Sequence, residues 1–82
     1  MIDIYQDVFD KTYQTILVAL ENRSKKADFS IQNIKGELLS FYRYDGLDWT
    51  GRGETKQAEN DGAILAYEVF IERYEKEHST NN

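Results

Sequence analysis

The chain contains no cysteine and no proline among its 82 residues, and it has only one histidine and one tryptophan. Without cysteine it can form no disulfide, thiolate nucleophile or thiolate metal site. Without proline, no residue forces a break in a helix. The apolar runs are only a few residues long, so no segment is predicted to span a membrane as a helix.

The N-terminal segment MIDIYQDVFD carries acidic rather than basic side chains and no long apolar run, so it does not predict a signal peptide. We therefore expect a cytoplasmic protein with no membrane association. Hydrophobic residues make up 40% and charged residues 30% of the chain, which is typical of a globular domain. We expect one helical domain over residues 1–78 and a disordered polar tail over residues 79–82. A core this small favours a partner or self-association.

The formal net charge is −5, and most of this excess lies in residues 54–82. Nucleic-acid-binding proteins usually present a basic face to the phosphates. The charge distribution therefore argues against nucleic acid as a partner. It is compatible with a basic protein partner or with solubility alone.

Apolar residues recur at helical spacing along the whole chain, which predicts an all-α fold. We expect helices over about residues 3–23, from Ser30 to about residues 45–46, and over about residues 54–78. Ser30 suits an N-cap, and Gly46 suits the left-handed position after a helix. The predicted fold is a small three-helix bundle, mostly antiparallel, with a loop containing glycine and tryptophan between the second and third helices.

The third helix is predicted to have two apolar faces, which is typical of a helix that packs on two neighbours. One face carries Tyr67 and Phe70 among others. The opposite face carries small and aliphatic residues, which are candidates for close helix packing or a dimer interface: Ala58, Gly62, Leu65, Ala66 and Val69. The simpler interpretation places this helix between the other two. The alternative makes one face the contact surface of a homodimer.

Few residues could carry catalysis or hold a metal. His78 lies near the C-terminus, where a general base would lack a fixed geometry. Asp45, Asp48 and Glu54 do not match the spacing of an EF-hand. We therefore expect no catalytic residue, no metal, no cofactor and no enzymatic activity.

The segment RYDGLDWTGRGE holds the residues best suited to binding. A glycine-rich turn before a helix can bind an anion, and Arg52 and Lys56 could add positive charge. Tyr44 and Trp49 are residue types that dominate protein interfaces. Asn60 continues the apolar stripe of the third helix beside Lys56, where the core either ends or meets a polar pocket. We expect it to end there.

Three functions follow from these observations. The first is a non-enzymatic protein-interaction module, regulatory or accessory, which we expect to be a homodimer. The second is a small-anion or nucleotide binder at the start of the third helix. The third is an acidic inhibitor of a basic protein, of the DNA-mimic or immunity type, since four acids of the third helix share one line: Asp61, Glu68, Glu72 and Glu75.

Overall fold

The computed structural model describes residues 3–47 and 54–78, with side chains described for residues 3–43 and 55–78. Three helices make up this part of the chain: α1 (Ile4–Arg23), α2 (Ile31–Leu47) and α3 (Glu54–Glu77). The predicted all-helical class and the three helices are confirmed. Among the described residues, no helix is both long and apolar enough to cross a membrane.

Local sequence signals place the helix starts. The Asp3 carboxylate accepts a hydrogen bond from the Gln6 backbone N–H at 3.2 Å, which caps α1. The Ser30 hydroxyl accepts one from the Asn33 N–H at 3.4 Å, at the predicted start of α2. The predicted stop was wrong in detail, because α2 includes Gly46 and ends at Leu47. Glycine occupies the helical region as readily as the left-handed one, so it does not by itself end a helix.

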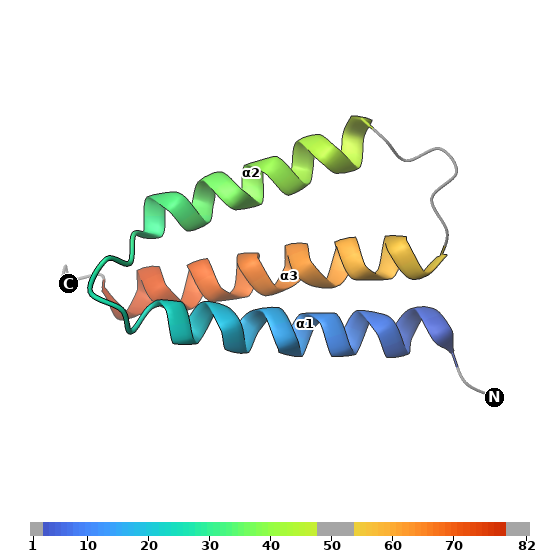
Figure 1. Cartoon of the computed structure of the whole chain (residues 1–82), viewed down its shortest axis with the longest axis horizontal. Coiled ribbons are helices and arrows are strands. Elements are labelled where there is room, and N and C mark those ends of the chain that lie inside the picture. The colour runs from blue at the N-terminus through green and yellow to red at the C-terminus, as the bar shows by residue number, and fades with distance from the viewer. Residues whose placement is uncertain (1–2, 48–53, 79–82) are drawn as a thin grey trace.

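Helix α3 lies between the other two helices (Figure 1). Its contact with α1 is the more extensive, and α1 and α2 have no Cα atoms within 8 Å of each other. Helices α1 and α3 run in the same direction, and α2 runs opposite to both (Figure 1). The predicted central place of the third helix therefore matches the arrangement of the chain.

Small residues of α3 allow α1 to approach closely. Ala58 and Ala66 are fully buried. A Cβ atom built on Gly62 would lie 2.7 Å from the Phe9 carbonyl oxygen and 3.3 Å from the Tyr13 nitrogen. Real Cβ atoms do not come so close to backbone, so the glycine sets the distance between α1 and α3.

Large side chains fill the space between α3 and α2. Leu20 of α1 and Ile34 of α2 are the largest fully buried side chains. They belong to one cluster with Tyr67 and Phe70 of α3. The Phe41 and Tyr67 rings lie 5.3 Å apart, tilted by 55°. Because aromatic side chains are bulky, α2 stands farther from α3 than a row of small residues would allow.

Candidate functional site

The first set of predicted binding residues does not form a single described surface. Trp49 and Arg52 lie outside the described residues, and so does the side chain of Tyr44. Lys56 is exposed on α3, whereas Asn60 is buried with 8% exposure. No buried side-chain nitrogen or oxygen in the described part lacks a hydrogen-bond partner. The core therefore continues toward the start of α3, beyond the point at which we expected it to end.

The second set lies on the α1 side of α3. Ala58, Gly62 and Ala66 are buried within the chain. Val69 is half-buried, and Leu65 is 37% exposed. Three of the five residues are thus covered by the chain itself, and Leu65 offers the largest free apolar surface of the set.

A polar network joins all three helices. The Arg23 guanidinium of α1 donates two hydrogen bonds to the Glu37 carboxylate of α2, each 2.9 Å long. The Tyr67 hydroxyl of α3 donates to the same carboxylate at 2.7 Å. Such paired, planar contacts are among the stronger polar interactions in proteins. The network fixes the end of the molecule at which α1 leads into α2.

Protonation of these groups follows from their contacts. The hydrogen bonds from Arg23 lower the pKa of Glu37 below its ordinary value, despite partial burial. Burial, and then the hydrogen bond to Glu37, raise the pKa of Tyr67 to about 12. At neutral pH, Glu37 is a carboxylate and Tyr67 a neutral donor. Both side chains are therefore in the states that the network requires.

A hollow of about 350 Å³ lies beside this network, lined by Glu37, Ser40, Phe41 and Tyr67. The polar groups at its wall already have partners inside the chain. Glu37 binds Arg23 and Tyr67, and the Ser40 hydroxyl donates to the Gly36 carbonyl oxygen at 3.3 Å. These atoms stabilise the fold.

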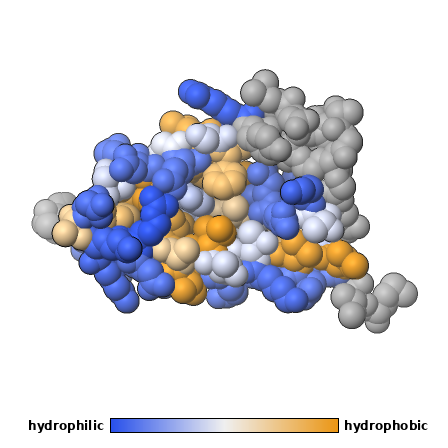
Figure 2. Space-filling view, in the orientation of Figure 1, coloured by the Kyte–Doolittle hydropathy of each residue, from blue (hydrophilic) through white to orange (hydrophobic). Residues whose placement is uncertain are grey.

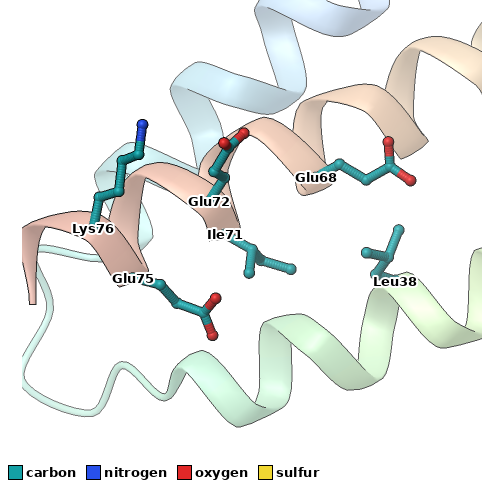
Figure 3. Close-up of a pocket in the computed structure, with 6 residues that line it drawn as sticks. All are labelled: Leu38, Glu68, Ile71, Glu72, Glu75 and Lys76. Atoms are coloured by element: carbon teal, nitrogen blue, oxygen red, sulfur yellow. The ribbon is translucent and has the colours of Figure 1, made fainter. Parts of the chain in front are cut away.

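A larger groove, of about 490 Å³, opens between α2 and α3. Leu38 of α2 and Ile71 of α3 point toward each other across it (Figure 3). Both side chains are only half-buried. The remaining lining residues are the charged side chains Glu68, Glu72, Glu75 and Lys76. The groove thus has an apolar floor and a mainly acidic border.

Two polar bridges between α2 and α3 stand at the two ends of this floor. Lys35 pairs with Glu75 at one end. At the other end the Tyr42 hydroxyl donates to the Glu68 carboxylate, which raises the pKa of Tyr42. The bridges are seven residues apart on each helix, which corresponds to about 10.5 Å. They link the two helices on either side of the apolar floor.

Glu72 and Lys76 differ from the other groove residues. They project from the side of α3 that faces away from α2 (Figure 3). Within the described part of the chain, Glu72 makes no hydrogen bond or ion pair. Its carboxylate is therefore free to pair with a group from outside.

Exposed apolar side chains also occur on α2 and α3 outside the groove lining. Leu39 and Tyr42 of α2 are 57% and 43% exposed. Leu65 precedes Glu68 by three residues and Glu72 by seven, so the three share one side of α3. By contrast, the face in Figure 2 carries its hydrophobic residues in small patches separated by hydrophilic ones.

Sequence reasoning missed both the network and the groove. Helical spacing places Glu37 off the apolar stripe of α2, and its partners lie 14 and 30 residues away along the chain. Leu38 and Ile71 pack against the core cluster, but their side chains remain partly exposed at the groove. The acidic line on α3 was the one available signal, because it contributes Glu68, Glu72 and Glu75 to the groove border.

No known protein family, curated protein or solved structure matches this chain. Among the described residues, no three histidine, aspartate or glutamate side chains are placed to hold a metal ion. The contacts and surfaces above are therefore the basis for inferring a function.

Proposed function

We propose that the protein is a non-enzymatic protein-interaction module that binds another polypeptide across the α2–α3 groove. The observation that carries this proposal is the half-buried pair Leu38 and Ile71 at the groove floor, with the exposed Leu39 next to Leu38 in the chain. Apolar side chains that remain in contact with water gain free energy when a partner covers them.

The geometry also favours a defined binding mode. The two bridges, Lys35 to Glu75 and Tyr42 to Glu68, link α2 and α3 at both ends of the floor. A surface that is already held in shape loses less conformational entropy on binding than a mobile one. An apolar side chain of a partner can therefore enter between the bridges without rearrangement of the helices.

From the sequence we expected the module to be a homodimer, and one face of α3 was the candidate contact surface. Ala58, Gly62 and Ala66 are buried in the chain, so a second copy could reach them only after α1 moved away. Leu65 remains as the exposed apolar residue on that side. Sedimentation of the purified chain over a dilution series tests the homodimer directly.

Anion binding at the start of α3 remains a second prediction. It depends on Arg52, which lies outside the described residues, and on Lys56, which is exposed. Thermal-shift measurements with inorganic phosphate test it. An Arg52→Ala variant should lose any stabilisation that phosphate gives the wild type.

Affinity capture with matched variants tests the interaction proposal. Leu39→Ser removes an apolar side chain beside the groove that is 57% exposed. Val18→Ser removes one from α1 that is 52% exposed, away from the groove. Partner recovery should fall for Leu39→Ser and stay at the wild-type level for Val18→Ser. Equal recovery with both variants would mean that the groove is not the binding surface.

A further inference from the structure

We infer that the occupant of the groove is a basic amphipathic helix of another protein, with an apolar anchor between Leu38 and Ile71 and a lysine or arginine on Glu72. This inference rests on the proposed function, since it names the partner of the same groove. It goes further by fixing the charge of the partner and the contact that recognises it.

The charge of the groove border supports a basic partner. Its lining holds three carboxylates, Glu68, Glu72 and Glu75, and one ammonium group, that of Lys76. The whole chain carries a net charge of −5. Complementary charge steers association and disfavours partners of like charge. An acidic or neutral segment would leave the Glu72 carboxylate without a matching group.

The Glu72 carboxylate determines where the cationic side chain of the partner would bind. Glu68 and Glu75 are engaged with Tyr42 and Lys35. Glu72 follows Ile71 in sequence and makes no polar contact within the described residues. A cationic side chain that follows the apolar anchor by three or four residues on a partner helix lies on the same face as that anchor. It can therefore reach Glu72 while the anchor contacts Ile71.

The distance between the bridges suits a helical partner. About 10.5 Å separates them along each helix, which equals two helical turns. An anchor residue together with the residues one turn before it and one turn after it occupies this length on a helix. Recognition of an amphipathic helix by an apolar groove between two helices is a recurrent mode of binding.

A second copy of this chain fits the groove poorly. In a two-fold symmetric dimer the same surface meets itself. The three carboxylates of the border would then face the three of the other copy, with Lys76 and the Glu75-bound Lys35 of each side to offset them. Like charges brought together at an interface are unfavourable. A partner of opposite charge removes this repulsion.

Fluorescence anisotropy with designed peptides tests the inference on the full chain. The probe is a labelled helix of about 18 residues, roughly 27 Å long, with leucine on one face and lysine elsewhere. A second peptide replaces every lysine by glutamate. A third keeps the composition of the first but scatters its leucines. We expect the lysine peptide to bind and the other two to bind at least tenfold more weakly, with affinity falling as salt rises.

Two glutamate variants identify the contact. Glu72→Gln and Glu59→Gln remove the same charge from exposed positions of α3, but only Glu72 borders the groove. Because an exposed ion pair contributes little, Glu72→Gln should weaken binding by about two- to fivefold. Glu59→Gln should leave the affinity unchanged.

The outcomes separate this inference from the proposed function. If the glutamate or scattered peptide binds as tightly as the lysine peptide, or if both variants lose equal affinity, the basic-helix inference is wrong. Failure of the lysine peptide to bind also overturns it. The interaction module would still stand if capture remained sensitive to Leu39→Ser. The proposed interaction module would itself be wrong if Leu39→Ser did not reduce capture of the partner.

Discussion

Gly62 of α3 lies so close to Phe9 of α1 that a Cβ atom on the glycine would stand 2.7 Å from the Phe9 carbonyl oxygen. The obstacle is backbone, which cannot move aside as a flexible side chain can. The distance between α1 and α3 thus depends on the absence of one carbon atom.

Gly62→Ala should lower the free energy of unfolding by about 1–2 kcal/mol, because overpacking outweighs the gain in helix propensity. Gly36 is the matched control, since a Cβ atom there meets nothing within 4 Å. Gly36→Ala should raise the free energy of unfolding by about 0.5–1 kcal/mol. Urea unfolding followed by circular dichroism measures both. A stabilised Gly62→Ala variant would contradict the close packing of α1 on α3.

Glu37→Gln should destabilise the protein by about 1 kcal/mol at neutral pH, since the half-exposed pair with Arg23 is partly screened by solvent. The pKa of Glu37 is lower in the folded state than its ordinary value of 4.5. The stabilisation is therefore complete above that value and is lost as the pH falls below it. The stability difference between wild type and variant should shrink in acid. A difference that does not change with pH would rule out the charged pair as its source.

Tyr67→Phe should remove one late-titrating phenol. Burial and the Glu37 hydrogen bond raise the pKa of Tyr67 from 10.0 to about 12 in the folded state. A raised pKa means that its contribution to stability is present below pH 10.0 and is lost as the pH rises toward 12. The near-ultraviolet absorbance of tyrosinate follows the titration. The absorbance lost in Tyr67→Phe should therefore belong to a tyrosine that ionises near pH 12. Loss of a tyrosine that ionises near pH 10.0 would contradict the burial of the Tyr67 hydroxyl.

Ser30→Ala should lower the free energy of unfolding by about 0.5–1 kcal/mol, because the Asn33 N–H then loses its acceptor at the start of α2. Ser40→Ala is the control. Its hydroxyl bonds to the carbonyl oxygen of the preceding helical turn, at Gly36, which already serves the helix. This second change should be neutral or slightly stabilising. Thermal unfolding of the two variants gives the comparison.

The helices were predictable because the signals that form them are local. Apolar spacing placed all three, and Ser30 and Asp3 mark the starts of α2 and α1. The two apolar faces of α3 indicated its central position. These features depend on residues within a few positions of one another, and a single sequence displays them directly.

The candidate site was not predictable in the same way. Helical spacing groups Tyr42 with the apolar stripe of Ile34 and Leu38, but its side chain is 43% exposed. Because α2 packs chiefly against α3, it buries a narrower face than its apolar spacing indicated. The partnership of Glu37 with Arg23 and Tyr67 depends on how three helices meet, and no spacing along the chain encodes it.

The central place of α3 has a consequence for how the sequence can vary. One apolar face of α3 packs on α1 and the other packs on α2. A substitution on either face therefore disturbs the packing of one neighbouring helix, and both faces must be preserved for the fold to stay intact. The backbones of α1 and α2 do not approach each other, and among the side chains that the structure describes their direct polar link is Arg23 to Glu37. Changes in α1 and α2 are thus coupled mainly through α3, which is the helix with the least freedom to accept mutation.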